Sequence, residues 1–287
     1  MTSDKRKAAK IIGTCRSTLI RLLKELKKAA GMLITPRTAC AEERAPAVLS
    51  EYIHFEGDGV TLGGYLSKPA GEGPFPGVMV VHDIRGISDD LKDITNNLAQ
   101  EGYATLSVNL VSRRLGPDFP GGSDEVVKVM FSLPDAEVMS DLDAGMDFLK
   151  KQPVVFTNSI GCMGICLGGR FSILYAGQRK DVKAAVIFYG DAVDPAATAQ
   201  QPKAPIEFVP QLTTPLLGNY GEEDTVVPLA NVKRFEAELQ KYGKVYDFKI
   251  YPGAQHAFLK KGPKYHAEAA KDAWERALNW FAKYLRT

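Results

Sequence analysis

The sequence has few of the features that mark several large classes of protein. Its four cysteines, at positions 15, 40, 162 and 166, form no CxxC pair, so we expect neither a zinc site nor a disulfide framework. Its four histidines lack metal-ligand spacing, and no glycine-rich phosphate loop follows a strand in the required form. We therefore expect no metal, no cofactor, and reduced thiols of the kind found in cytoplasmic proteins.

An excess of one charge is also absent from most of the chain. The formal net charge is +2, and residues 1–44 hold 11 Lys and Arg against 4 Asp and Glu. A nucleic-acid-binding protein would be expected to carry its basic residues across a folded face and not in one terminal segment. No apolar run is long enough to span a bilayer. We therefore expect neither a nucleic-acid partner nor a transmembrane segment.

The remaining composition is that of a globular domain. The chain has 287 residues, of which 45% are hydrophobic and 24% charged, which suffices for one domain with a full core. Residues 1–47 read as a basic amphipathic helical extension, with apolar residues three or four apart between Lys10 and Leu33. This helix could pack on its own domain, form a homodimer, attach to a membrane surface or act as an organellar presequence.

Residues 48–287 are expected to form the catalytic domain. Short apolar runs predict strands at 51–55, 60–67, 77–82, 103–110, 160–165, 182–189, 215–220 and 245–251, with helices near 89–101, 135–151, 168–177, 228–242 and 265–285. Strands that alternate with helices in this way predict an α/β fold, with a mostly parallel sheet of about eight strands and helices on both faces. Two long loops, 113–123 and 191–214, are candidates to cover a pocket.

The most informative motif is Gly164-Ile165-Cys166-Leu167-Gly168-Gly169, which follows an apolar strand and precedes a helix. A nucleophile that projects from the end of a sheet needs a sharp turn, and flanking glycines remove the clashes that such a turn creates. The positive end of the following helix also favours the thiolate form of cysteine. The motif predicts a nucleophile elbow, although a buried core cysteine in a tight turn is the alternative.

Two polar residues downstream support the catalytic interpretation. Asp224 follows the strand at 215–220, with Glu222 and Glu223 as rival acids, and His256 follows the strand at 245–251. Nucleophile, acid and histidine thus occur in the order that an elbow requires, each at the carboxyl end of a strand. We expect Cys166 to attack, His256 to transfer the proton and Asp224 to orient the imidazole.

A tetrahedral intermediate needs two hydrogen-bond donors for its oxyanion. The backbone N–H of Leu167, next to the nucleophile, is one candidate. The loop after the strand that ends at His82 supplies the other, for which Ile84 N–H is the natural choice.

As an ordered set, these motifs resemble the dienelactone hydrolase (carboxymethylenebutenolidase) family of the α/β-hydrolase superfamily over about residues 50–285. The set comprises Tyr65-Leu-Ser-Lys-Pro69, His82-Asp-Ile-Arg-Gly86, Glu101-Gly-Tyr103, the elbow, Gly221-Glu-Glu-Asp224 and Pro252-Gly-Ala-Gln-His-Ala-Phe258. The resemblance implies a triad of Cys166, Asp224 and His256, and an oxyanion hole at Ile84 and Leu167. It also implies that Asp83, where the family more often has Glu, handles the thiol before substrate arrives.

The predicted substrate is a small ester or lactone, but the anion clamp of the family is altered. Lys260 stands where family members that act on carboxylate-bearing lactones have arginine, and lysine lacks the planar fork that binds a carboxylate through two hydrogen bonds. Lys260 and Arg85 are the candidate substrate-binding residues. A thioesterase or general carboxylesterase, a thiol redox protein that uses Cys166, and a non-catalytic binding or assembly protein that uses the N-terminal helix are the alternatives.

Overall fold

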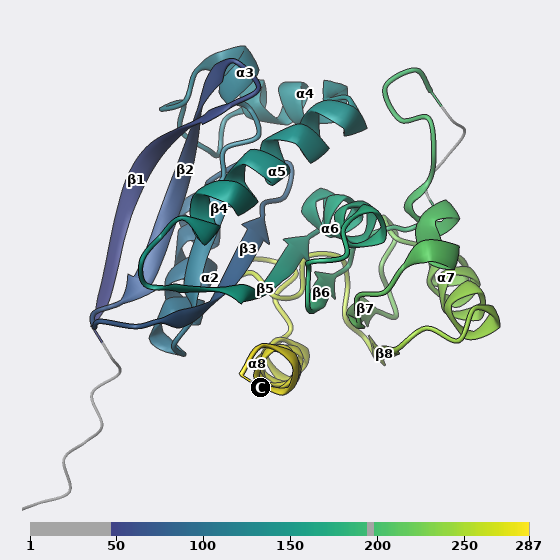
Figure 1. Cartoon of the computed structure of the whole chain (residues 1–287). Helices are drawn as coiled ribbons and strands as arrows, with labels where there is room; N and C mark the ends of the chain where they lie inside the picture. Colours follow the sequence, from purple (N-terminus) through teal and green to yellow (C-terminus); the bar gives the residue numbers. More distant parts are fainter. Residues whose placement is uncertain (1–46, 194–197, 287) are drawn as a thin grey trace, which may run out of the picture. The chain divides into compact units, whose positions relative to one another are not determined.

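The computed structural model describes residues 47–193 and 198–286. The helix expected between Lys10 and Leu33, and with it the predicted homodimer contact, lies outside these residues. The described residues contain one sheet with helices on both faces (Figure 1), which confirms the expected α/β-hydrolase fold.

The sheet has eight strands in the order β1-β2-β4-β3-β5-β6-β7-β8. The first two strands form a hairpin in which Gly57 pairs with Val60. Its turn consists of Asp58 and Gly59, both at positive φ. Two residues at positive φ give the turn twist that matches antiparallel strands. From β4 onward all neighbouring strands are parallel. The strands are β1 (Val48–Gly57), β2 (Val60–Pro69), β3 (Phe75–Val81), β4 (Ala104–Val108), β5 (Val155–Ile165), β6 (Ala185–Phe188), β7 (Leu216–Gly221) and β8 (Tyr246–Tyr251).

Both faces of the sheet are buried, as strand β3 shows. Val78 and Val80 belong to one apolar cluster, whereas Met79 and Val81 belong to the other. Successive side chains of a strand point to opposite faces. The run is therefore apolar throughout because helices cover it on both sides.

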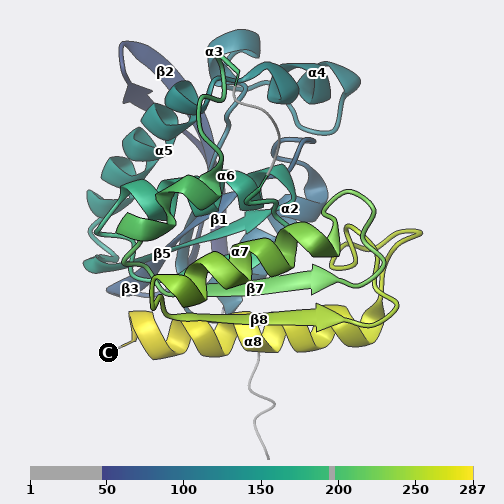
Figure 2. The ribbon, with the colours of Figure 1, turned by 90° about the vertical axis from the view of Figure 1, so that its right-hand side faces the viewer.

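The helices divide between the two faces. Helices α2 and α8 cover one face, while α5, α6 and α7 cover the other (Figures 1 and 2). Helices α2, α5, α7 and α8 each present an apolar stripe to the sheet and polar residues to solvent, whereas α6 is buried from Gly168 to Gly177. The helices are α2 (Asp89–Gln100), α3 (Ser112–Leu115), α4 (Asp124–Ser132), α5 (Asp135–Lys150), α6 (Leu167–Gln178), the 3₁₀ helix η1 (Pro205–Gln211), α7 (Leu229–Lys241) and α8 (Ala267–Leu285).

Three short helices occur outside the helices predicted from the sequence. Helix α3 begins at the edge of the expected loop 113–123, and η1 lies inside the expected loop 191–214. Helix α4 was not expected at all, although its start carries a local signal. The Ser123 hydroxyl accepts a hydrogen bond from Val126 N–H at 3.2 Å, with Asp124 and Glu125 in the first turn, which is a typical helix start.

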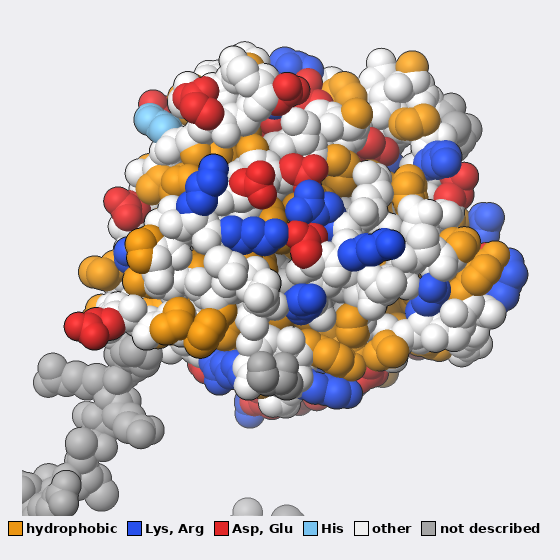
Figure 3. Space-filling model, viewed as in Figure 1, with side chains coloured by type: hydrophobic (Ala, Val, Ile, Leu, Met, Phe, Trp, Pro, Cys, Tyr) orange, Lys and Arg blue, Asp and Glu red, His pale blue; other side chains and the backbone are white. Residues whose placement is uncertain are grey.

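The surface carries no extended area of one charge on the face that Figure 3 shows, where basic and acidic side chains are interspersed. No helix within 47–193 or 198–286 is long and apolar enough to cross a membrane. The same residues contain no group of three or more His, Cys, Asp or Glu side chains that could hold a metal ion.

Candidate active site

Cys166 occupies a sharp turn between strand β5 and helix α6. Its φ of 56° and ψ of −120° lie outside the regions that L-residues usually adopt, a strain that folded proteins keep mainly at functional sites. A Cβ on Gly164 would collide with the carbonyl oxygen of Gly168, and a Cβ on Gly168 would collide with that of Val81. Glycine is therefore required at both positions, and the turn presents the thiol at the end of the sheet.

The turn brings Cys166 next to two residues that are distant in sequence. His256 Nε2 lies 3.0 Å from Cys166 Sγ, and His256 Nδ1 lies 2.8 Å from Asp224 Oδ2. Parallel strands end at one edge of the sheet, so the loops after β5, β7 and β8 meet there. The structure thus joins the three expected residues in a hydrogen-bonded series.

The acid of this series is itself held in place. Asp224 Oδ1 accepts hydrogen bonds from the backbone N–H groups of Val226 and Val227, at 2.8 and 2.9 Å. The ring edge of Tyr189 packs against His256, with 4.9 Å between ring centroids. These contacts hold both the carboxylate and the imidazole in position.

Charge interactions favour a protonated His256. Burial alone lowers the pKa of this imidazole, but hydrogen bonds with Asp224 and Cys166 outweigh it and raise the pKa to about 9. The other described cysteine differs, because burial raises the pKa of Cys162 to about 12. Cys162 is therefore a protonated core residue at neutral pH, and of the two cysteines that the structure describes only Cys166 has an acid–base partner.

The loop after β3 is anchored by a buried histidine. His82 Nε2 accepts a hydrogen bond from Leu110 N–H at 3.2 Å, so Nδ1 carries the proton and donates to the Asp83 carbonyl at 2.8 Å. Burial lowers the pKa of His82, which keeps the ring neutral. These two bonds tie the loop that carries Ile84 to the end of strand β4.

A cavity of about 330 Å³ opens beside the thiol. Ile84 and Leu167, the expected oxyanion-hole residues, both line it next to Cys166 and His256. The first N–H groups of a helix have no acceptor within that helix, so Leu167 N–H, at the start of α6, is free of an intrahelical partner. The remaining lining residues were not expected from the sequence: Phe131, Arg170, Tyr189, Asp191, Val226 and Val227.

Some of these lining residues carried a signal in the sequence. Arg170 follows Cys166 by four residues, which is one turn of the predicted helix and places both on one side of it. Asp191 begins the long loop 191–214 that was expected to cover a pocket. No residue of the other expected loop, 113–123, is among the described lining residues. Phe131 belongs to helix α4, which was not predicted, so no sequence signal indicated that Phe131 would line a cavity.

The expected substrate-binding cations do not line this cavity. Lys260 Nζ instead bonds with the Asp83 carboxylate, and the second Asp83 oxygen accepts from Arg85 N–H at 2.8 Å. The guanidinium of Arg85 is exposed and donates to the Gly122 carbonyl at 3.1 Å. The side chains of Lys260 and Asp83 are each about one-tenth exposed. Their opposite charges therefore compensate for the water that each has lost. Both Asp83 oxygens are therefore occupied by groups other than Cys166.

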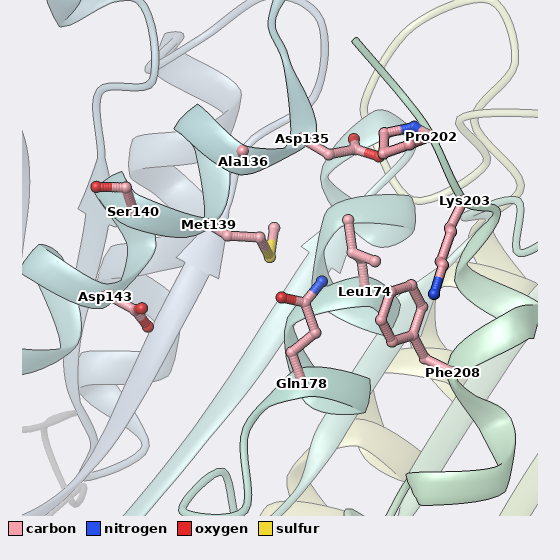
Figure 4. A pocket seen from close by; sticks show the side chains of 10 residues that line it. All are labelled: Asp135, Ala136, Met139, Ser140, Asp143, Leu174, Gln178, Pro202, Lys203 and Phe208. Carbon is pink, nitrogen blue, oxygen red and sulfur yellow. The ribbon is translucent and has the colours of Figure 1, made fainter. Parts of the chain in front are cut away.

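A second, larger cavity of about 450 Å³ adjoins the first. Figure 4 shows it between α5 and α6, with Leu174 and Phe208 among its apolar lining and Lys203 at one side. Asp135 lines this second cavity and Arg170 lines the first, and the two side chains are joined by hydrogen bonds of 2.6 and 3.0 Å. This ion pair therefore links the linings of the two cavities, and Cys166 and His256 line the smaller one.

Comparison with known sequences agrees with this architecture. A candidate carboxymethylenebutenolidase from Methylorubrum extorquens is 39% identical over 229 residues, which is 79% of this chain and 78% of the relative. A candidate carboxymethylenebutenolidase from Escherichia coli K12 is 31% identical over 241 residues, or 83% of this chain and 88% of the relative.

Solved structures and a family model give the same result. A candidate dienelactone hydrolase from Klebsiella pneumoniae superposes with a TM-score of 0.77 at 32% identity, covering 83% of this chain and all of the other. A dienelactone hydrolase-like promiscuous phosphotriesterase from metagenomic libraries, 20% identical, covers 83% of this chain and 99% of its own with a TM-score of 0.70, and shares the fold. The model of the dienelactone hydrolase family matches residues 62–285. The chain therefore belongs to the dienelactone hydrolase family and is a hydrolase of ester bonds.

Proposed function

We propose that this protein hydrolyses activated esters or lactones through an acyl-cysteine intermediate, with Cys166, His256 and Asp224 as its catalytic triad. The observation that supports this most is the unbroken series from thiol to imidazole to carboxylate, with 3.0 and 2.8 Å between the bonded atoms. The series ends in a cavity that is large enough for a small ester. No other thiol within the described residues has a neighbouring base.

In the first half of the reaction the thiolate of Cys166 attacks the acyl carbon. The bond from that carbon to the alcohol oxygen breaks, and the imidazolium of His256 gives its proton to the departing alcohol. An acyl-cysteine thioester and a neutral imidazole remain. Ile84 N–H and Leu167 N–H stabilise the negative oxygen of the tetrahedral intermediate, because both line the cavity beside the nucleophile.

In the second half a water molecule attacks the thioester carbon and gives a proton to His256. The carbon–sulfur bond breaks, the carboxylic acid leaves, and the thiolate and imidazolium are restored. Asp224 stabilises the cationic imidazole in both halves. In the resting site Lys260 and Arg85 N–H each bind one oxygen of Asp83, and any help that Asp83 gives the thiol uses the remaining acceptor positions of this carboxylate.

The proposal is tested by mixing the enzyme rapidly with p-nitrophenyl acetate. We expect a burst of p-nitrophenol close to the enzyme concentration, followed by a slower steady rate, because the thioester accumulates before water attacks it. Acid quenching and mass spectrometry should then find an acetyl group on the peptide that contains Cys166. An acetyl group on any other residue, or turnover without a covalent adduct on Cys166, would contradict the mechanism.

The pKa of His256 predicts the alkaline side of the activity profile. Because this pKa rises from the ordinary 6.5 to about 9, the imidazolium that protonates the alcohol persists through neutral pH and is lost as the pH passes about 9. We expect kcat/KM for an alkyl ester, followed in a pH-stat, to fall there. Asp224→Asn should move this fall to lower pH, since the carboxylate helps to hold the proton; an unmoved fall would argue against His256 as its source.

The proton on His256 also affects the free energy of unfolding. The folded chain binds it more tightly than the unfolded chain does, so its stabilising contribution is complete below pH 6.5 and disappears as the pH rises through about 9. Denaturant unfolding at pH 6 and pH 10 should show this loss in the wild type. His256→Gln, which cannot titrate, should show less change between these two values.

A further inference from the structure

Apolar side chains dominate the lining of the catalytic cavity. They come from the loop after β3, the start of α6 and the segments that face them: Ile84, Phe131, Leu167, Val226 and Val227. Tyr189 adds an aromatic ring whose buried hydroxyl has no hydrogen-bond partner. Phe131 is 67% exposed and Val226 is 56% exposed, although both are large and hydrophobic. Side chains of this kind gain free energy when a ligand removes them from water, so the rim is suited to an apolar group.

Arg170, which lines the cavity, is already paired with a carboxylate, and only its Nε has no hydrogen-bond partner. The two carboxylate oxygens of Asp135 bind the guanidinium of Arg170, and both side chains are less than one-tenth exposed. The carboxylate of Asp191 also lines the cavity, with one oxygen bonded to Val193 N–H and the other to Asn231 Nδ2. Within the part of the chain that the structure describes, no lining residue offers an uncompensated positive charge to a ligand.

These two features bear on the acyl part of the substrate. After the alcohol leaves, the acyl chain stays bonded to Cys166 and must lie in the cavity until water attacks. A carboxylate on that chain would lose its hydration without gaining a free cation, and it would also approach Asp191. An alkyl chain would instead cover the apolar lining and the exposed rim.

We infer that the substrates of this enzyme are esters with an uncharged, apolar acyl chain of several carbons, and that a carboxylate on the acyl chain is disfavoured. This inference rests on the proposed function, because it assigns the occupant of the same site. It differs from the expectation that Lys260 and Arg85 hold an anionic substrate, since neither lines the cavity.

The test compares kcat/KM for p-nitrophenyl acetate, p-nitrophenyl hexanoate and mono-p-nitrophenyl adipate, with the Cys166→Ala protein as the blank for uncatalysed hydrolysis. Hexanoate and adipate have the same chain length and differ in the terminal carboxylate. We expect kcat/KM to rise from acetate to hexanoate by about 3- to 4-fold for each methylene that the cavity covers. The adipate ester should be at least about 10-fold poorer than the hexanoate ester.

A matched pair of variants tests whether the preference for hexanoate over acetate arises at the rim of this cavity. Phe131→Ala removes the exposed aromatic ring at the rim and should lower the ratio of hexanoate to acetate kcat/KM by about 3- to 10-fold. Phe156→Ala makes the same change to a ring that is 48% exposed at the other end of strand β5 from Cys166, and should leave the ratio unchanged.

The possible results distinguish a failure of this inference from a failure of the proposed function. Turnover of acetate together with an adipate rate equal to or above that of hexanoate would overturn the inference and leave the proposed function intact. An unchanged ratio in Phe131→Ala would also overturn it. Failure of the wild type to hydrolyse any of the three esters above the blank would instead refute the proposed function.

Discussion

Replacing Cys166 by alanine should lower kcat for ester hydrolysis by roughly 10⁴-fold or more, because in the proposed mechanism the thiolate forms the covalent intermediate and alanine has no nucleophile to replace it. The fold should tolerate the change, since the side chain is small and partly exposed. Steady-state release of p-nitrophenol measures the effect, and circular dichroism checks that the protein is folded.

Cys162→Ala provides the matched control for this loss. Cys162 lies inside β5, four residues before Cys166, and is fully buried and protonated. Its replacement should cost about 1 kcal/mol of stability from the small cavity left behind, and should keep turnover within a few-fold of wild type. Similar turnover in Cys166→Ala and the wild type would show that the thiol is not the nucleophile.

Replacing Asp135 by alanine should lower the free energy of unfolding by about 3–5 kcal/mol, because it leaves the buried cation of Arg170 without its partner. Both side chains are almost completely buried, at 8% and 4% exposure, so water cannot replace the lost carboxylate. Urea unfolding followed by tryptophan fluorescence measures the change.

Helix α5 contains its own control for this prediction. Asp143 also pairs with an arginine, Arg179 at 2.7 Å, but its side chain is 46% exposed. Asp143→Ala should therefore cost only about 0–1 kcal/mol. If the two substitutions were equally mild, the pair between the cavities would not be structurally important. Replacing Asp135 and Arg170 together by leucine should recover much of the loss, since an apolar pair needs no compensation.

The fold followed from the sequence because its signals are local. Apolar runs such as Gly77–His82 and the turn at Asp58 and Gly59 depend on neighbouring residues alone, and strand and helix periods separate them clearly. Reliance on local signals also explains why helix α4 was not predicted. Its start at Ser123 follows a glycine-rich stretch that resembles a loop.

The three residues of the series were also predictable. Cys166, Asp224 and His256 each follow a strand, and parallel strands place their carboxyl ends at one edge whatever the details of packing. Sequence order and strand position were therefore enough to bring these side chains together without any distance being known.

By itself, the sequence determined the α/β-hydrolase fold, the sharp turn at Cys166 and the order of Cys166, Asp224 and His256 along the chain. The tertiary structure alone decided which charges neutralise one another and which side chains form the cavity. Lys260 meets Asp83 across 177 positions of sequence and Arg170 meets Asp135 across 35, and Phe131 reaches the cavity from a separate helix. Such contacts depend on how helices and loops pack over the sheet. A buried charge pairs with whichever opposite charge the packing brings close to it, and local sequence does not encode that packing.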